Sequence, residues 1–366
     1  MQFDELAVLV KPASGLCNMA CTYCFDREAA HTRGIMPDAT VQALLENVFA
    51  HTRRSVTFAF QGGEPTLAGL DFYRRFVERV EAQRPADMTV SYALQTNGIA
   101  LDEAWASFLA ENRFLVGLSV DGTASIHDKY RQTPNGAGTY LQVRQAAEAL
   151  QAAGVEFNIL TVVTKDLCRQ AKKIYADFKR QGFSCFQFIL CLAPEEAPVQ
   201  PFVPTPNDYA KFLIDLFDVW YADWRSGQYH SVRYFDNLIR ICMGQPAELC
   251  SLRGACSLQL VVEADGACYP CDFYVAEPYR LGNVKDASIR DMLHSAGAKR
   301  FQQPAQTAAE CRTCTYASLC GGGCRRERFG GSKTVCCEAY RRFFQACLPR
   351  MLAVAAGVRR TRQSEI

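Results

Sequence analysis

The first half of the chain alternates between short apolar runs of strand length and longer segments with a helical pattern. A strand followed by a helix, repeated several times, is typical of a parallel sheet with helices outside it. Six such units can form a partly closed barrel or a doubly wound open sheet, and periodicity does not choose between them. The six runs occupy residues 6–10, 56–60, 90–94, 114–120, 155–163 and 185–190.

Other segments have local signals of their own. Apolar residues recur on one face of a helix expected over residues 37–49. Thr205 is a good N-cap for a long helix that Gly227 ends. Residues 258–270 form two short apolar runs around an Asp-Gly turn, which predicts a hairpin. Residues 359–366 are expected to be a frayed polar tail.

The bulk composition excludes several classes of function. The 40 Lys and Arg residues nearly balance the 38 Asp and Glu residues, so the formal net charge of +2 gives no footprint for nucleic acid or an anionic membrane. No apolar run approaches the roughly 20 residues of a membrane span, and the N-terminus lacks a signal-peptide pattern. We therefore expect a cytoplasmic protein with no nucleic acid and no membrane among its partners.

Cysteine is the outlier, with 18 residues. In a large chain without an export signal, clustered thiols more often bind metal or do chemistry than form disulfides. Cys17, Cys21 and Cys24 form C-x3-C-x2-C in the loop after the first apolar run. Three thiolates on a four-iron cluster leave one iron open, and a ligand can bind and react there. Zinc is the alternative, with His31 as the nearby fourth ligand.

This motif, with Tyr23 before its last cysteine, resembles the radical S-adenosylmethionine (SAM) superfamily, and Gly62-Gly63-Glu64-Pro65 resembles that superfamily's second motif. The resemblance implies a partial (β/α)6 barrel, one [4Fe–4S] cluster on the three cysteines, and SAM as the source of a 5′-deoxyadenosyl radical. Glycines let a backbone approach the ligand, and a carboxylate suits its ammonium group. The residues implied to bind SAM are Tyr23, Gly62, Gly63, Glu64, Gln95, Ser119 and Leu192. For Gln95 and Ser119, ordinary strand-end hydrogen bonding is the alternative.

A second group of cysteines lies in the C-terminal third. Its spacing, C-x9-G-x4-C and then C-x2-C-x5-C-x3-C with one more cysteine, resembles the SPASM domain of radical enzymes that modify peptides. The resemblance implies two auxiliary [4Fe–4S] clusters with every iron ligated, which suits electron transfer. It places Cys250, Cys256, Cys271 and Cys324 on one cluster, and Cys311, Cys314, Cys320 and Cys337 on the other. Cys336 is an alternative to Cys337, and a zinc ribbon is the competing interpretation. Small buried hydrophobes are expected at Cys168, Cys185, Cys191, Cys242, Cys268 and Cys347.

From about residue 6 to residue 355 the chain resembles the anaerobic sulfatase-maturing enzymes, notably over residues 11–14, 58–69, 94–98, 114–119 and 269–274. That resemblance implies oxidation of a cysteine or serine in an unfolded or nascent sulfatase polypeptide to Cα-formylglycine, by hydrogen abstraction from Cβ. It gives Asp272 the role of removing the thiol or hydroxyl proton, helped by desolvation, although a solvated surface aspartate is the alternative. Gln61 is expected to face the peptide. Asp26 departs from the family, in which many members have tyrosine at that position.

The resemblance also implies a domain plan and partners. A radical SAM partial barrel with its connecting helix is expected over residues 1–235, a SPASM domain over 236–350 and a C-terminal tail over 351–366. A flavodoxin or ferredoxin-type reductant is expected by analogy. The main alternative is a SPASM maturase that forms thioethers or crosslinks in another ribosomal peptide, although such enzymes usually begin with a leader-recognition domain and this chain begins its first strand almost at once. A zinc-binding adaptor and a redox wire are two further alternatives.

Overall fold

The computed structural model describes residues 2–25, 34–193, 200–304, 308–328 and 332–364. These residues form two compact units, and each unit is discontinuous in sequence. The first unit comprises Met1–Val120, His127–Asn158 and Leu258–Gln302. The second unit comprises Asp121–Ile126, Ile159–Ser257 and Gln303–Ile366.

The first unit is built around a mixed sheet whose strand order is β12-β11-β10-β1-β4-β5-β6. Strands β10, β1, β4, β5 and β6 run parallel, whereas β11 is antiparallel to both of its neighbours. The strands are β1 (Phe3–Val10), β4 (Thr52–Phe60), β5 (Thr89–Thr96), β6 (Leu115–Ser119), β10 (Leu260–Val262), β11 (Ala267–Tyr269) and β12 (Gly282–Asn283). A separate short pair consists of β2 (Ala13–Ser14) and β3 (Gly34–Ile35).

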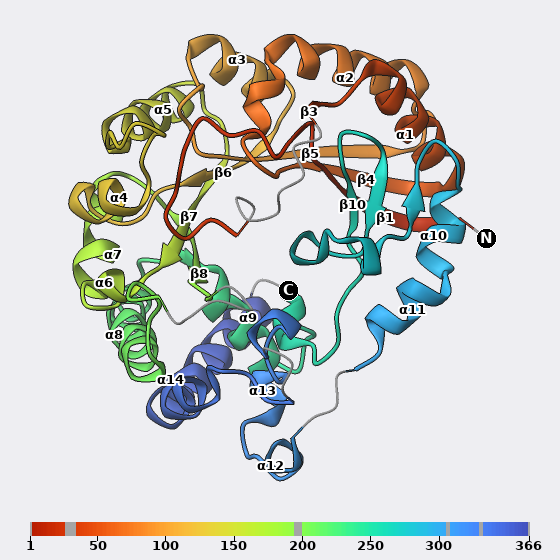
Figure 1. Ribbon diagram of the computed structural model, residues 1–366. Helices are drawn as coiled ribbons and strands as arrows, with labels where there is room; N and C mark the ends of the chain where they lie inside the picture. Colours follow the sequence, from red (N-terminus) through yellow and green to blue (C-terminus); the bar gives the residue numbers. More distant parts are fainter. Residues whose placement is uncertain (1, 26–33, 194–199, 305–307, 329–331, 365–366) are drawn as a thin grey trace. The chain divides into compact units, whose positions relative to one another are not determined.

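Helices cover one face of this sheet, as Figure 1 shows for α1, α2 and α3 beside β4 and β5. The aromatic core lies between them, where Phe58 and Phe60 of β4 each meet Phe76 of α2 with ring centroids 5.2 and 5.0 Å apart. Successive strand residues face opposite ways, so Ala59 and the residue after Phe60 face away from these helices. The helices of this unit are α1 (Asp38–His51), η1 (Pro65–Ala68), α2 (Leu70–Gln83), α3 (Glu103–Glu111), α5 (Tyr140–Ala152), η3 (Asp272–Tyr274), η4 (Glu277–Tyr279), α10 (Ile289–His294) and α11 (Ala296–Gln302). Helix α4 (Ala124–Tyr130) has residues in both units.

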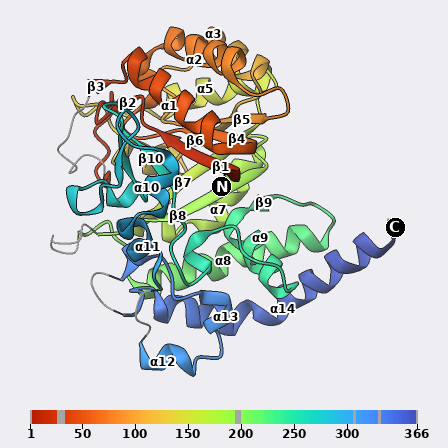
Figure 2. The same cartoon turned by 90° about the vertical axis from the view of Figure 1, so that its right-hand side faces the viewer.

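The second unit contains the parallel strands β7 (Phe157–Val163), β8 (Cys185–Leu190) and β9 (Ser231–Val232), although β7 begins in the first unit. Three long helices pack together beside them: α8 (Pro206–Arg225), α9 (Arg233–Cys242) and α14 (Cys337–Ser364), which Figure 2 shows lying along one another. The remaining elements are short: α6 (Lys165–Cys168), α7 (Ala171–Arg180), η2 (Cys250–Leu252), α12 (Ala309–Arg312), α13 (Ala317–Cys320) and η5 (Arg325–Glu327).

All six strands predicted from the apolar runs are present, as β1, β4, β5, β6, β7 and β8. The predicted helix over residues 37–49 is α1, and the predicted hairpin is formed by β10 and β11. Thr205 caps α8 in a capping box with Asp208, whose carboxylate accepts in return from the Thr205 backbone N–H.

One arrangement differs from the expectations. The stretch expected as a C-terminal tail is helical as far as Ser364, because Met351, Val354 and Ala355 recur on one buried face of α14. The hairpin also makes a pairing that was not expected, because its strand β10 runs parallel to β1. The predicted domain boundaries at residues 235 and 350 stay a prediction. None of the helices within the described ranges has the length and apolarity that a membrane crossing requires.

Candidate active site

Three polar residues follow three adjacent parallel strands directly. Glu263 follows β10, Lys11 follows β1 and Gln61 follows β4. Leu9 is in register with both Ala59 and Val261, so strand alternation puts the three polar residues on the face that is turned away from α1 and α2. Ligands of open parallel sheets bind beyond the carboxyl ends of the strands, so this edge is the candidate active site.

Asp272, the predicted base, lies at this edge. Its Oδ1 is 2.8 Å from the Lys11 ammonium, and its Oδ2 accepts a hydrogen bond from the Gln61 amide at 2.6 Å. Lys11 is also 3.4 Å from the Glu263 carboxylate. The Asp272 side chain keeps 10% of its surface exposed, so the solvated surface aspartate considered above is not what the fold provides. The structure therefore brings the two predicted residues Gln61 and Asp272 into direct contact.

The glycines of the Gly-Gly-Glu-Pro loop are required by the chain itself. Both have positive φ, +90° for Gly62 and +57° for Gly63, a region in which other residues are strained. A Cβ atom at Gly62 would lie 2.5–2.7 Å from three methylene carbons of Lys11. A Cβ atom at Gly63 would collide with the backbone carbonyl of Leu16. The loop therefore packs against the first strand's extension and against the cysteine loop.

Glu64 is the centre of a buried hydrogen-bond network and is 1% exposed. Its Oε1 accepts from the Thr66 backbone N–H and from the hydroxyls of Thr66 and Thr96, and its Oε2 accepts from the Asn97 backbone N–H at 2.7 Å. Burial raises the pKa of Glu64, and these hydrogen bonds oppose that shift. Both oxygens thus accept hydrogen bonds within the chain, and the contact of this carboxylate with a ligand ammonium stays a prediction.

The loop that bears Cys17, Cys21 and Cys24 is held from several sides. The Ala20 and Thr22 backbone N–H groups donate to Gln132 and Tyr130, and the Leu16 carbonyl accepts from the Glu64 N–H. The pKa of Cys17 is raised to about 11, mainly by desolvation of the thiol and also by Glu64, Cys21 and Cys24, while the hydrogen bond from the Met19 backbone opposes the shift. The three thiols are thus close enough to oppose one another's ionisation, and bound iron provides the positive charge that keeps such thiols deprotonated. The donor set fits a cluster held by three cysteines.

The other residues predicted to bind SAM lie at separate strand ends. Tyr23 is half-buried, and its hydroxyl accepts a hydrogen bond from the buried Arg131 guanidinium at 2.9 Å. Gln95 on β5 and Ser119 at the end of β6 share the sheet face of Ala59, because Gln95 is in register with Gly117. Leu192, two residues beyond β8, belongs to the second unit.

Two exposed rings connect the cysteine loop with the Asp272 turn. Phe25 directly follows Cys24, and Phe273 directly follows Asp272. Their ring centroids are 4.8 Å apart, and both side chains remain about two-fifths exposed, at 42% and 40%. Exposed paired aromatic rings present an apolar surface beside polar groups, which suits a peptide ligand. Asp26, at which the chain departs from the family, and His31, the alternative zinc ligand, lie outside the described residues.

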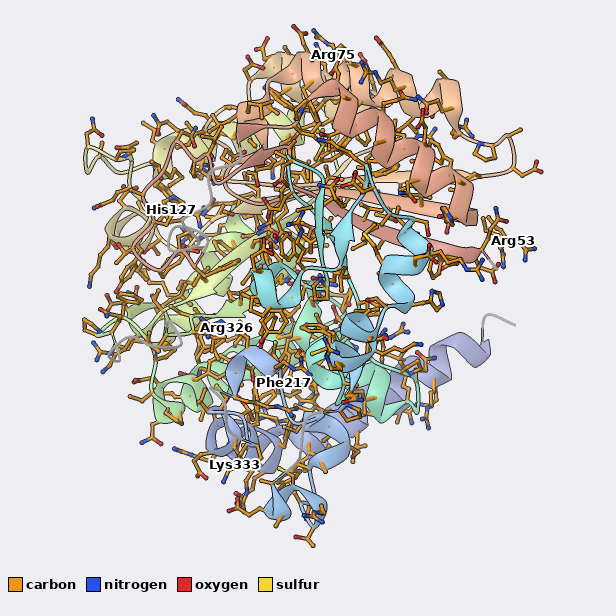
Figure 3. The ribbon with its side chains drawn as sticks, turned by 45° about the vertical axis from the view of Figure 1, so that its right-hand side comes forward. Arg53, Arg75, His127, Phe217, Arg326 and Lys333 are labelled. Carbon is orange, nitrogen blue, oxygen red and sulfur yellow. The ribbon has the colours of Figure 1, made fainter. Side chains whose placement is uncertain are left out.

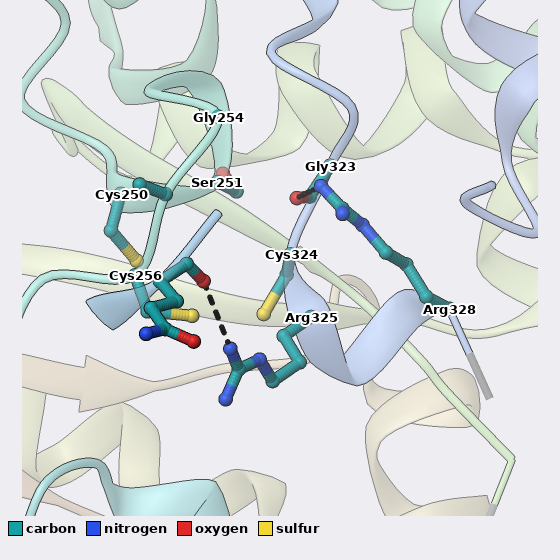
Figure 4. A pocket seen from close by; sticks show the side chains of 10 residues that line it. Cys250, Ser251, Gly254, Cys256, Gly323, Cys324, Arg325 and Arg328 are labelled. Atoms are coloured by element: carbon teal, nitrogen blue, oxygen red, sulfur yellow. Dashed lines mark hydrogen bonds between the residues drawn. The ribbon is translucent and has the colours of Figure 1, made fainter. Parts of the chain in front are cut away.

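Three of the four cysteines assigned to one auxiliary cluster line a common pocket in the second unit. Cys250, Cys256 and Cys324 line one open pocket, and Figure 4 shows their side chains around one space beside Arg325. Desolvation raises the pKa of Cys324 to about 11, and Cys250 and Cys256 contribute to that shift. A pocket lined by thiols fits an iron–sulfur cluster. Cys271, the fourth predicted ligand, belongs to the first unit.

The second set of four cysteines also converges. The thiols of Cys311 and Cys314 act on the ionisation of Cys337, and Cys311 and Cys337 act on that of Cys320. Lys333, labelled in Figure 3, also faces Cys337 and lowers its pKa against the larger effect of desolvation. Cys320 and Cys337 thus each have two other thiols of the set as electrostatic neighbours, as the predicted cluster requires, although no group of three or more ligand side chains within the described residues is gathered closely enough to hold a metal ion.

Cys336 lies in a different environment. It is 5% exposed, and its electrostatic neighbours include Glu327 and Cys168. Burial raises its pKa strongly, as expected for an inert buried thiol. Cys337, with Cys311 and Cys314 beside it, is therefore the better ligand candidate. Of the six cysteines expected as buried hydrophobes, Cys168, Cys191, Cys268 and Cys347 are buried, while Cys185 and Cys242 are half-buried.

Sequence reasoning gave no role to three buried charged residues of the site: Lys11, Glu263 and Arg131. Lys11 and Glu263 share one signal, a charged residue immediately after a buried strand, which by itself usually marks a solvated strand end. No sequence pattern around Arg131 predicts its role, since its hydrogen bond to the Tyr23 hydroxyl forms only in the tertiary structure.

Comparisons with family models define the class of protein. The Radical SAM superfamily model matches residues 12–176, and the SPASM model, an iron–sulfur cluster-binding domain, matches residues 250–315. The fold prediction is thereby confirmed: the chain is a radical SAM protein with a C-terminal SPASM domain.

Individual relatives narrow the class further. The chain is 39% identical to the cysteine-type anaerobic sulfatase-maturating enzyme of Clostridium novyi (strain NT), over 96% of this chain and 97% of the relative. The serine-type enzyme of Bacteroides thetaiotaomicron is 28% identical over 94% and 90% of the two chains. The solved structure of native anSMEcpe with bound AdoMet and Cp18Cys peptide matches with a TM-score of 0.93 and 41% identity, over 97% and 99% of the chains. The chain belongs to the family of anaerobic sulfatase-maturating enzymes.

Membership confirms that the protein is an enzyme with SAM and iron–sulfur clusters as cofactors. It does not favour a maturase for another class of ribosomal peptide. The roles of individual residues remain predictions, for which the geometry above supplies the physical basis.

Proposed function

We propose that the chain oxidises a cysteine of a sulfatase polypeptide to Cα-formylglycine. The choice of cysteine over serine is supported by the higher identity to the cysteine-type relative, 39% against 28%. When bound, the cofactors would supply a 5′-deoxyadenosyl radical for abstraction of the hydrogen atom from the substrate Cβ. Cys17, Cys21 and Cys24 would hold the cluster that binds SAM.

The observation that carries this proposal is the contact between the rings of Phe25 and Phe273. Since these residues directly follow Cys24 and Asp272, the contact makes the radical cysteine loop and the predicted base neighbours. Hydrogen abstraction and deprotonation act on one substrate residue, so the two groups must flank it. The exposed parts of the two rings offer the substrate segment an apolar surface to lie against.

Asp272 is the proton acceptor in this proposal. Its carboxylate takes the proton of the substrate thiol, and Gln61, which shares its Oδ2 in the substrate-free protein, orients the residue that arrives. Tyr23, Gln95, Ser119 and the loop at Gly62 and Gly63 line the SAM side of the edge. Arg131, buried beside Tyr23, supplies a guanidinium suited to a carboxylate. Leu192 would contact the adenine. The Arg326 guanidinium (Figure 3) donates a hydrogen bond to the backbone carbonyl of the next residue, Ala193, at 3.4 Å, and so helps to fix the segment after β8 within the second unit.

The SPASM cysteines complete the enzyme. Cys250, Cys256, Cys271 and Cys324 would hold one auxiliary [4Fe–4S] cluster, and Cys311, Cys314, Cys320 and Cys337 the other. With every iron ligated, such clusters suit electron transfer rather than substrate binding, and they would accept the second electron of the oxidation. The resulting thioaldehyde of the substrate would be hydrolysed by water, with release of hydrogen sulfide, to give the aldehyde. The proposed partners are an unfolded or nascent sulfatase polypeptide and a flavodoxin or ferredoxin-type reductant. The proposed location is the cytoplasm, where both are found.

Mass spectrometry of a sulfatase-motif peptide tests the function. Cysteine and serine versions are incubated anaerobically with reconstituted enzyme, SAM and dithionite, and 5′-deoxyadenosine is followed in parallel. We expect the cysteine peptide to form the aldehyde faster. Asp272→Asn should lower product formation by about 10²-fold or more while deoxyadenosine still forms, whereas Cys24→Ala should abolish both. Deoxyadenosine without oxidation of either peptide by the wild-type enzyme would reject the sulfatase assignment.

A further inference from the structure

We propose that Lys11 is the positioning residue for Asp272: its buried ammonium holds Oδ1 in place, so that Oδ2 alone is presented to the substrate. This inference rests on the proposed function, because it concerns the carboxylate that the proposal makes the base. It adds a residue to which the family resemblance gave no role.

The burial of Lys11 is the first argument. Its side chain is 2% exposed, although a lysine is almost never fully buried unless it is paired. Two carboxylates surround the ammonium, Asp272 at 2.8 Å and Glu263 at 3.4 Å. Desolvating a cation costs free energy, so a buried lysine at this place must be paired with a carboxylate. The cost also favours a role for Lys11 beyond packing.

The position of the ammonium is set by its stem. The Lys11 backbone N–H donates to Val262 O, which fixes the residue between β4 and β10. Its methylene chain lies against Gly62, where a single added carbon would overlap with three of its atoms. Lys11 is therefore confined along its length, and the same glycine that shapes the loop also makes room for it. A confined cation can orient a carboxylate in a way that a mobile surface lysine cannot.

The two oxygens of Asp272 have partners of different character. Oδ1 forms an ion pair with the Lys11 ammonium at 2.8 Å, and the Lys11 side chain is 2% exposed. Oδ2 is bound by Gln61, a half-buried neutral amide. A neutral hydrogen bond at a partly open position is easily exchanged for one from a substrate, whereas a buried ion pair is not. Lys11 is thus the fixed partner and Gln61 the exchangeable one.

The competing explanation is that Lys11 only balances two buried negative charges. Removing it alone would leave Asp272 and Glu263 facing one another, and such a variant can fail to fold for that reason. The charge-balanced variant Lys11→Met/Glu263→Gln avoids this, because it removes one positive and one negative charge together. Lys11→Arg keeps the charge but moves the head group. Lys179→Met, which breaks the 2.6 Å ion pair to Asp223 in the second unit, is the matched control.

The experiment measures four quantities for each full-length reconstituted variant: iron content, Kd for the cysteine peptide, kcat and KM for formylglycine, and deoxyadenosine formed per product. For Lys11→Met/Glu263→Gln we expect wild-type iron content and a Kd and KM within about threefold of wild type. We expect kcat to fall by about 10-fold or more, and deoxyadenosine per product to rise correspondingly. Lys11→Arg should show the same uncoupling in milder form. The Lys179→Met control should keep the wild-type ratio.

Each result decides between the explanations. A wild-type kcat and ratio in the charge-balanced variant would overturn the inference, because charge balance alone would then suffice. If that variant fails to take up iron, Lys11→Arg decides, and a wild-type ratio there would also overturn it. A wild-type enzyme that makes deoxyadenosine but oxidises neither peptide would reject the proposed function, and this inference with it.

Discussion

Two charged residues of this site, Glu64 and Lys11, have structural roles that their residue types alone do not predict. Glu64 sits in the motif that suggests a ligand contact, yet its carboxylate accepts four hydrogen bonds from Thr66, Thr96 and Asn97. It thereby joins the loop after β4 to the end of β5. The position of Lys11, directly after a buried strand, is typical of a solvated charge, yet its side chain is 2% exposed and forms an ion pair with Asp272. In both residues, the position of the charge relative to the sheet edge decides its role.

His127 gives a prediction of pH-dependent stability. This residue of α4, labelled in Figure 3, is fully buried, and its Nε2 lies 3.1 Å from the Thr139 hydroxyl. Burial lowers its pKa to about 3, and Arg131 contributes. A folded pKa below the unfolded value of about 6.5 means that the unfolded chain binds the proton more readily, so stability is lost as pH falls from about 6.5 towards 3.

Between pH 7 and pH 5 this site should lower the free energy of unfolding by roughly 2 kcal/mol. His127→Gln, which keeps a hydrogen-bonding group near Thr139, should show a correspondingly smaller loss. Anaerobic urea unfolding at the two pH values measures the difference. Equal losses in the variant and the wild type would show that His127 is not the titrating group.

At the scale of elements, the loop between β4 and α2 offers a matched pair of glycines. Gly62 and Gly69 both have positive φ, +90° and +83°. A Cβ atom at Gly62 would meet the Lys11 stem, whereas one at Gly69 would have nothing within 4 Å. The backbone cost of alanine is therefore shared, and the steric cost falls on Gly62 alone.

We expect Gly69→Ala to destabilise the protein by about 1–3 kcal/mol, because φ +83° with ψ 150° is a backbone conformation that is essentially restricted to glycine. Gly62→Ala should cost a further 1–3 kcal/mol or so, because the packed lysine stem must move. Urea midpoints and product formation measure both effects. We expect product formation to fall much more in Gly62→Ala, and equal behaviour of the two variants would contradict the close packing of Lys11.

The strands were predictable because buried parallel strands are continuous apolar runs, and each of the six could be read without knowledge of its neighbours. The pairing of β10 with β1 was not, since a parallel contact between distant segments leaves no local trace. The ion pairs of Lys11 could not be predicted for the same reason, because the pairing of β10 with β1 is what brings Asp272 and Glu263 close to it. The cysteine sets were assigned by family resemblance, and the preference for Cys337 over Cys336 stays a prediction, which the neighbouring thiols of Cys311 and Cys314 support.

At the scale of the whole molecule, the two units differ in how much regular secondary structure they contain. The first unit has a sheet with an aromatic core, while the cysteine-bearing segments of the second unit contain elements of only three or four residues, η2, α12, α13 and η5. Such short helices are not stable by themselves in water. Their order therefore depends on what binds the cysteines.

Removal of iron should affect the chain locally. We expect hydrogen exchange in the iron-free protein to become about tenfold faster or more in residues 250–256 and 311–337, with β4 and β5 nearly unchanged. Exchange mass spectrometry of the iron-loaded and iron-free protein measures this. A uniform acceleration across both regions would show that the clusters stabilise the whole fold.

The parallel pairing of β1 with β10 also bears on how the chain is made. While the ribosome synthesises the polypeptide, β4 can join β1 early, but the other edge of β1 stays open until Leu260–Val262 has emerged. An open apolar strand edge invites pairing with other chains. A chain that terminates before that point would expose this edge of β1 permanently. The C-terminal third of the polypeptide therefore protects the first strand from aggregation, in addition to its predicted role in binding the clusters.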